Sequence, residues 1–209
     1  MSVKEYKTVN IETSVEFIEK KSRFIGYIKP VNTSQSALEF IQSIKSTHYN
    51  ATHNVYAYII KDEGVVRYSD DGEPTGTAGI PTLDVLQKSN LTDVVVVVTR
   101  YFGGILLGGG GLVRAYSHTA KLAVDDAQII TMQMCPICSI ECSYNQYGKI
   151  ASLIPECNGV VEDTIFTDNV TIKFNISYEN LKLLNKDLQE ITCGDIQAKI
   201  CDEKFIKIK

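Results

Sequence analysis

The stretch VVVVVTRYFGGILLGGGGLVRAYSHTAK, Val94 to Lys121, carries the strongest fold signal in the chain. Its valines form a short, continuous apolar run, which is typical of a strand buried on both faces. Two glycine clusters follow, and from Leu112 to Ala127 the apolar residues recur at the spacing of a helix. A buried strand that leads through glycines into a helix is the layout of many phosphate-binding loops. The first question is therefore whether this loop binds phosphate.

The common phosphate-binding motifs do not match the glycine loop. Gly103 and Gly108 have the first spacing of a P-loop, but Gly109 and Gly110 stand where lysine and serine or threonine are needed. The dinucleotide-binding fingerprint fails too, because its third position holds neither glycine nor alanine. The amides at the start of the helix still favour an anion. The alternative is that the glycines allow positive φ angles and close packing of the loop on the sheet.

Length and charge limit the class of protein. The chain has 209 residues, enough for one large domain or two small ones, and a net charge of −4. This balance argues against a strongly basic coat protein for nucleic acid and against DNA as a partner, but it allows a local basic patch. The valine run is too short to span a bilayer, and the N-terminus has no apolar signal core. We expect a cytoplasmic protein with no membrane partner.

The rest of the N-terminal half predicts an α+β domain around the valine strand. Alternation, capping residues and turn residues give the approximate elements. They are strands at 6–11 and 23–28, a helix from the N-cap Ser34 to about Thr47, a hairpin of 53–60 and 64–70, an irregular segment at 70–81, and a short helix that begins at Pro81 or Thr82.

The C-terminal part has a different order of predicted helices and strands. Its pattern predicts the order βαββαβ, the ferredoxin-like split unit. The elements are strands at 137–144, 159–166, 170–177 and 196–208 and helices at 147–157 and 179–191. We therefore predict two domains, residues 1–133 and 134–209, joined near Gln133.

The spacing of some cysteines and histidines resembles that of metal ligands, but we do not predict a metal site. Cys135, Cys138 and Cys142 have a tempting spacing, but a fourth ligand is not obvious. On a strand, Cys138 and Cys142 share one face and Cys135 takes the other. A zinc site made of His48, His53 and His118 is conceivable, but we expect each of these histidines to be hydrogen-bonded singly. We predict reduced thiols, no metal and no cofactor.

The segment RYSDDGEPTGTAG is a second candidate site. Asp70, Asp71 and Glu73 could bind a hard cation or act as acid and base, although the spacing does not fit an EF-hand. The alternative is a charged surface turn. No common hydrolase motif is present, so the sequence favours binding over catalysis. We expect this acidic loop and the glycine loop to lie side by side at one end of the N-terminal sheet.

Four blocks together resemble the YigZ/IMPACT family: KKSRF, THNVYAY, RYSDDGEPTGTAGIPTLDVL and VVVVVTRYFGGILLGGGGLVRAY. The resemblance implies an N-terminal α/β sandwich of the ribosomal-protein second-domain type. It implies a C-terminal ferredoxin-like domain similar to domain V of elongation factor G. Eukaryotic relatives regulate translation by competing for an activator of an initiation-factor kinase, but they carry a different partner domain.

Two hypotheses for function follow. The first is a translation-associated regulatory or binding protein that engages the ribosome, structured RNA or a protein partner through the loop surface of the N-terminal domain. The second is an enzyme or a binder of small anions that uses the acidic loop against the glycine loop. The candidate ligand-binding residues are Arg67, Asp70, Asp71, Glu73, Arg100, Tyr101, Gly103, Gly104, Gly110 and Arg114.

Overall fold

The computed structural model describes residues 4–208 and divides them into two compact units. The N-terminal unit comprises residues 6–131, and the C-terminal unit comprises residues 132–208 with residues 4 and 5. Each unit has a sheet and its own hydrophobic core, so the predicted α+β class is confirmed. No helix among the described residues is long and apolar enough to cross a membrane.

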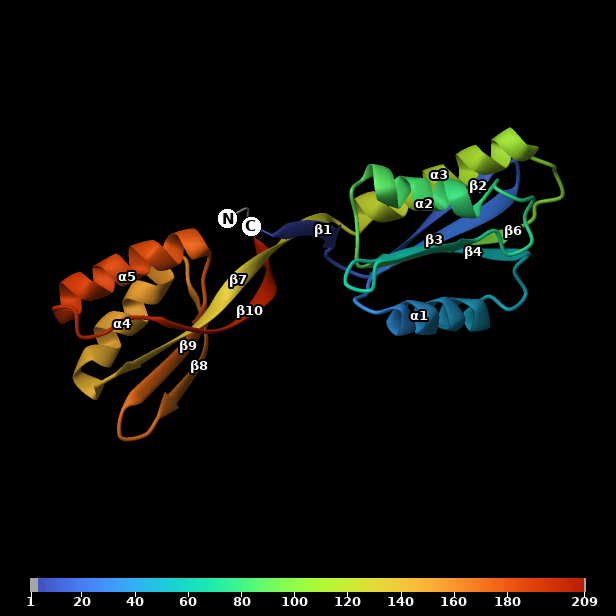
Figure 1. Ribbon diagram of the computed structural model, residues 1–209. Helices are drawn as coiled ribbons and strands as arrows, with labels where there is room; N and C mark the ends of the chain where they lie inside the picture. The colour runs from blue at the N-terminus through green and yellow to red at the C-terminus, as the bar shows by residue number, and fades with distance from the viewer. Residues whose placement is uncertain (1–3, 209) are drawn as a thin grey trace. The chain divides into compact units, whose positions relative to one another are not determined.

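The N-terminal unit is a three-layer sandwich. Its sheet has the order β2-β3-β6-β4-β5, and every neighbouring pair is antiparallel. Helix α1 (Ser34–Thr47) covers one face, while α2 (Gly79–Lys88) and α3 (Gly109–Asp126) cover the other (Figure 1). The strands are β2 (Thr13–Glu19), β3 (Ser22–Pro30), β4 (His53–Ile60), β5 (Val65–Ser69) and β6 (Val94–Tyr101).

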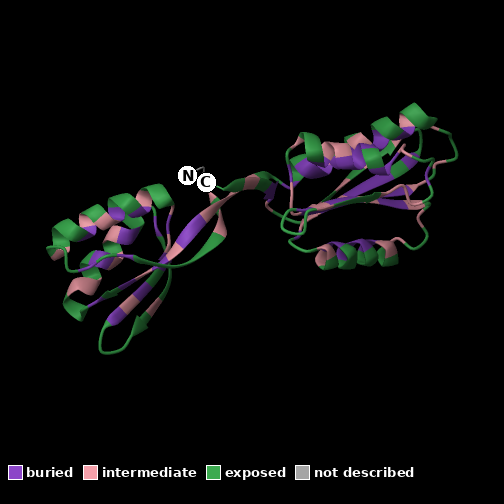
Figure 2. Cartoon of the chain, viewed as in Figure 1, coloured by how far each residue is buried: buried purple, intermediate pink, exposed green. Residues whose placement is uncertain are grey.

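Strand β6 is the centre of this sandwich. All five residues from Val94 to Val98 are 0% exposed, and Figure 2 shows the middle of the sheet as buried. Val96 belongs to the core beneath α2 and α3, whereas Val97 belongs to the core beneath α1. Since successive side chains of a strand point to opposite faces, the continuous valine run supplies both cores. The predicted strand with two buried faces is confirmed.

The C-terminal unit is ferredoxin-like, as predicted. Strand β7 pairs with both β9 and β10, and β8 pairs with β9, so the four strands have the spatial order β10-β7-β9-β8. Strand β1 (Glu5–Val9) also pairs with β7. The elements are β7 (Ile129–Cys142), α4 (Tyr144–Glu156), β8 (Val160–Phe166), β9 (Val170–Asn175), α5 (Tyr178–Thr192) and β10 (Lys199–Ile208).

Several element boundaries differ from the predicted ones. Helix α3 begins at Gly109 rather than Leu112, because packing of its later turns outweighs the low helix propensity of three glycines. Helix α2 begins at Gly79, before the expected Pro81. The N-cap of α1 is Thr33 rather than Ser34, since the Thr33 hydroxyl accepts a hydrogen bond from the Ser36 amide. Strand β7 begins at Ile129, eight residues before the expected start at 137.

Strand β2 was not predicted at all. It is an edge strand that pairs with β3 through the turn at Lys20 and Lys21, and both turn residues have positive φ angles. Its alternation is blurred because Ile18, on the outward face, is 62% exposed. An apolar residue on the solvent side hides the period-two signal on which strand prediction depends.

Candidate functional site

The acidic loop (residues 70–78) and the glycine loop (residues 102–108) lie side by side, as expected. Strand β4 is antiparallel to both β5 and β6, so β5 and β6 run in the same direction and the loops that follow them leave at the same end of the sheet. A Cβ atom placed on Gly109, just after the glycine loop, would lie 3.8 Å from the Thr77 Cγ2 atom. The topology therefore brings the two candidate segments together.

A buried ion pair joins the acidic loop to the end of β6. Glu73 Oε1 accepts hydrogen bonds from Arg100 Nη1 at 2.6 Å and from the Tyr116 hydroxyl at 2.7 Å. Glu73 Oε2 lies 3.8 Å from His53 Nε2. The side chains of Glu73 and Arg100 are only 2% and 6% exposed. We call these four residues, His53, Glu73, Arg100 and Tyr116, the Glu73 cluster.

The Glu73–Arg100 pair at the centre of the cluster is almost closed to solvent. The Arg100 guanidinium carbon lies 5.5 Å from the centre of the Phe24 ring and 5.6 Å from that of the Phe102 ring. Its Nε atom is buried and has no hydrogen-bond partner among the described residues. Burial, followed by the charge of Glu73, raises the pKa of Tyr116, so its hydroxyl stays protonated and donates. We assign the cluster the role of locking the acidic loop onto β6.

Asp70 holds the acidic loop in shape from within. Its carboxylate accepts hydrogen bonds from three backbone amides, those of Gly76, Ala78 and Gly79, at 2.8–3.1 Å. Burial by itself raises the pKa of Asp70, but these three hydrogen bonds together bring that pKa below its usual value. Its oxygens are thus already occupied by the turn that leads into α2.

Asp71 ties the same loop to β4 and α1. One carboxylate oxygen accepts a hydrogen bond from the Asn54 amide at 2.7 Å, and the other from Lys45 Nζ at 2.6 Å. The backbone carbonyl of Asp71 accepts a hydrogen bond from His53 Nδ1 at 2.7 Å. Together with Glu73, these contacts give every carboxylate of the loop a partner within the protein, and this geometry does not favour a hard cation.

The glycines of the second loop have separate local roles. A Cβ atom on Gly103 would lie 2.0 Å from the backbone carbonyl carbon of Lys21, so only glycine fits there. Gly104 and Gly108 have φ angles of +82° and +72°, which other residues rarely adopt. Gly110, in the first turn of α3, has open space around it. These contacts favour the packing and turn roles of the glycines over a phosphate cradle.

The three remaining predicted residues lie apart from the Glu73 cluster. Arg67 is exposed on β5, the edge strand. The Tyr101 hydroxyl is hydrogen-bonded to His48 Nδ1 at 2.8 Å and donates to Asn50 Oδ1 at 3.3 Å. Arg114 is exposed on α3. The predicted residues therefore belong to at least three different environments.

Arg114 lines an open groove of about 930 Å³ between β2, α2 and α3, which we call the Arg114 groove. Three partly buried apolar side chains of the groove also pack on the core: Phe17, Val85 and Leu107. The groove is further lined by the basic residues Lys20, Lys88, Arg114, His118 and Lys121, and by one acidic residue, Glu19.

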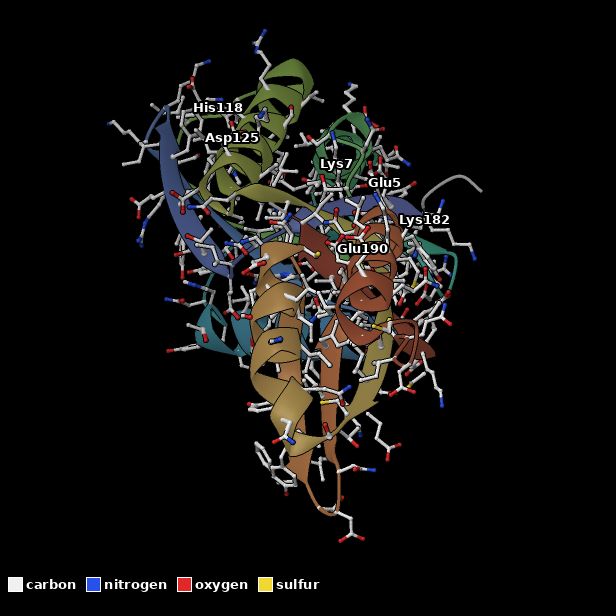
Figure 3. All side chains as sticks on the ribbon, turned by 90° about the vertical axis from the view of Figure 1, so that its left-hand side faces the viewer. Glu5, Lys7, His118, Asp125, Lys182 and Glu190 are labelled. Atoms are coloured by element: carbon white, nitrogen blue, oxygen red, sulfur yellow. The ribbon has the colours of Figure 1, made fainter. Side chains whose placement is uncertain are left out.

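The basic residues of the groove differ in how far they are neutralised. Lys88 lies 3.6 Å from Asp84, and Lys121 forms an ion pair with Asp125, four residues further along α3. Figure 3 shows His118 and Asp125 on this helix. Lys20 and Arg114 have no ion pair within residues 4–208. Positive charge is therefore in excess along the groove.

Sequence reasoning found only Arg114 in this groove. Part of the signal was readable, because Arg114, His118 and Lys121 stand at i, i+4 and i+7 and so share one face of α3. Lys20 and Lys88 come from a turn and from another helix, and only the tertiary fold brings them to the same groove.

We predict that purified protein carries less than stoichiometric zinc or iron on Cys135, Cys138 and Cys142. Cys138 and Cys142 lie in the C-terminal core, and burial raises the pKa of Cys138 to about 11, which favours the thiol over the metal-binding thiolate. Elemental analysis of protein purified without chelator provides the measurement. Stoichiometric metal that is lost in a Cys138→Ser variant would contradict this prediction.

Comparisons with known proteins agree with the two-unit architecture. A family model described as the Impact N-terminal domain matches residues 20–124, and a domain of unknown function (DUF1949) matches residues 140–194. A solved structure described as "Crystal structure of an hypothetical protein" has a TM-score of 0.60 and 28% identity, and the match covers 96% of this chain and 98% of that one. The fold and the matched regions define a two-domain α+β protein with an Impact-type N-terminal domain.

Whole-chain relatives then identify the family. IMPACT family member YvyE of Bacillus subtilis (strain 168) is 37% identical over 195 residues, which cover 93% of this chain and 90% of the relative. IMPACT family member YigZ of Escherichia coli (strain K12) is 33% identical, with coverage of 91% and 95%. Protein IMPACT of Homo sapiens is 31% identical over 102 residues, 47% of this chain and 32% of that protein. The chain belongs to the IMPACT family.

Proposed function

We propose that the protein is a translation-associated RNA-binding protein and that it binds RNA through the N-terminal unit. The observation that carries the proposal is the Arg114 groove, where basic residues gather although the whole chain has a net charge of −4. Attraction to phosphate is the general basis of RNA affinity, and a local basic groove supplies it without a basic chain. Membership of a family that includes eukaryotic Protein IMPACT supports the link to translation through the resemblance described above.

The alternative, an enzyme or a binder of small anions that uses the acidic loop against the glycine loop, receives less support. Its carboxylates accept hydrogen bonds from the protein itself, and the Glu73–Arg100 pair is buried. A general base needs access to the proton that it removes. We therefore leave Glu73 and Arg100 out of the proposed RNA-binding surface and keep Arg114, together with the lysines around it.

We predict that Arg114→Ala weakens RNA binding by about 1–3 kcal/mol, the range for a lost charge-assisted hydrogen bond. Binding of a fluorescent RNA stem–loop by the full chain, measured by anisotropy at two salt concentrations, provides the test. Affinity should fall with salt, because contacts to phosphate release counterions. The control is Lys182→Ala, an exposed lysine on α5 of the other unit (Figure 3), which should bind like the wild type.

Two outcomes would count against this proposal. Equal binding by the wild type and both variants, with thermal melts showing that all are folded, would exclude the groove. Binding by none of them at either salt concentration would exclude RNA as a ligand. Purification of the tagged chain from cells, with and without nuclease, distinguishes RNA binding from binding to a protein partner. A protein partner would remain bound after the RNA is digested.

A further inference from the structure

The Arg114 groove contains an apolar surface that phosphate contacts alone do not explain. Phe17, Val85 and Leu107 pack on the core with part of their surface and line the groove with the rest. An RNA duplex presents mainly phosphates and sugar hydroxyls to such a groove, because its bases are stacked inside the helix. These three side chains would then lose water without gaining an apolar partner.

An unpaired nucleotide fits both parts of the groove. Its base has a flat, largely apolar face that stacks on aromatic and apolar side chains, and its phosphate is an anion. The volume of about 930 Å³ is at the upper end of the range for sites that hold ligands of drug or nucleotide size. Basic side chains beside an apolar floor therefore match an unpaired nucleotide better than a duplex.

The basic side chains of α3 form a row along the groove. Arg114, His118 and Lys121 follow one another along the same face, across roughly 10 Å of helix. The His118 and Phe17 rings form a T-shaped pair, with ring centres 4.6 Å apart and planes at 72°. The imidazole is thus held by the floor residue while basic groups lie on both sides of it along the helix. This order suits a strand that contacts the helix with successive phosphates.

We infer that the Arg114 groove binds unpaired nucleotides of an RNA strand, with a base on Phe17, Val85 and Leu107 and the phosphates at Lys20, Arg114 and Lys121. This inference rests on the proposed RNA-binding function and specifies which part of an RNA is bound. Loops, bulges and single-stranded ends of structured RNA are the regions that offer such nucleotides.

The experiment compares three labelled RNA probes with the same number of phosphates. One is an unstructured single strand, one is a fully paired, blunt-ended duplex with no loop, and one is a single strand with abasic sites, which keeps the phosphates but lacks the bases. The wild type should bind the first probe roughly 5- to 150-fold tighter than the third, the ratio that corresponds to stacking of one base. It should also prefer the single strand to the blunt-ended duplex.

Two variants test the apolar and the basic side chains of the groove separately. Phe17→Leu keeps an apolar side chain against the core but removes the ring, so it should reduce the preference for bases without changing the salt dependence. Arg114→Gln should instead reduce the slope of log affinity against log salt by about 1, the effect of one lost phosphate contact, and leave the preference for bases intact. Lys182→Ala, on the C-terminal unit, should change neither quantity.

The possible failures are distinguishable. Equal affinity of the wild type for all three probes would overturn the inference and leave the proposed RNA-binding function standing. Failure to bind any probe would overturn both. Competition by free uridine monophosphate at concentrations that match the affinity of the single strand would show that the groove takes a free nucleotide, and would overturn the assignment to an RNA strand.

Discussion

Replacing Glu73 with glutamine is expected to lower the free energy of unfolding by about 3–5 kcal/mol, the usual effect of removing one partner from a buried ion pair. The glutamine has nearly the same shape, but it leaves the Arg100 guanidinium, in a side chain only 6% exposed, without a counter-charge. The Tyr116 hydroxyl would keep an acceptor, so most of the loss comes from the unpaired buried charge. Urea unfolding, followed by circular dichroism, measures the effect.

The matched control is Glu16→Gln. Glu16 also accepts a hydrogen bond from an arginine, Arg23, at 2.7 Å, but the two side chains are 44% and 50% exposed. Exposed ion pairs contribute little to stability, because water screens them. A loss in Glu73→Gln no larger than that in Glu16→Gln would show that the buried pair does not hold the acidic loop in place.

The second large effect is expected at Gly103. A methyl group in Gly103→Ala would lie 2.0 Å from the Lys21 carbonyl carbon and 2.4 Å from the Ser22 nitrogen. Both are backbone atoms of the β2–β3 turn, so no side chain can rotate away. We expect a loss of about 3 kcal/mol in the free energy of unfolding, at the upper end of the usual cost of overpacking, measurable by the same urea unfolding.

The control for Gly103 is Gly110→Ala. Gly110 lies in the first turn of α3, and an added Cβ would meet no atom within 4 Å. Alanine is the better helix former, so this variant should be unchanged or stabilised by up to about 1 kcal/mol. Similar stability of the two variants would contradict the packing role that we assign to Gly103.

Much of the fold could be predicted from local patterns. The run Val94–Val98 indicated the central strand, because only a strand with two covered faces tolerates unbroken apolar residues. The βαββαβ order of the C-terminal unit followed from the alternation of short strands with amphipathic helices. Strand β2 was not predicted, because its outward face carries the apolar residue Ile18. The start of α3 was predicted three residues too late, because glycine normally disfavours a helix.

The candidate site was less accessible to sequence reasoning. Glu73 and Arg100 were predicted as ligand-binding residues from their charge and from the loops that hold them. Sequence does not reveal that Phe24 and Phe102 flank the arginine and close it off from solvent. The Arg114 groove depends on residues from separate elements, such as Lys20 and Lys88, and only the packing of α2 and α3 against the sheet creates it.

The Glu73 cluster has a consequence for how the sequence can change over time. Loss of either Glu73 or Arg100 alone leaves the other buried charge without a partner. Replacing the whole buried pair with well-packed apolar side chains is, in contrast, often neutral or even stabilising. A sequence with the ion pair and a sequence with an apolar pair can therefore both be stable. Each single substitution on the way from one to the other would unfold a marginally stable protein. Stepwise mutation is therefore expected to leave this pair where it is, whether or not it ever meets a ligand.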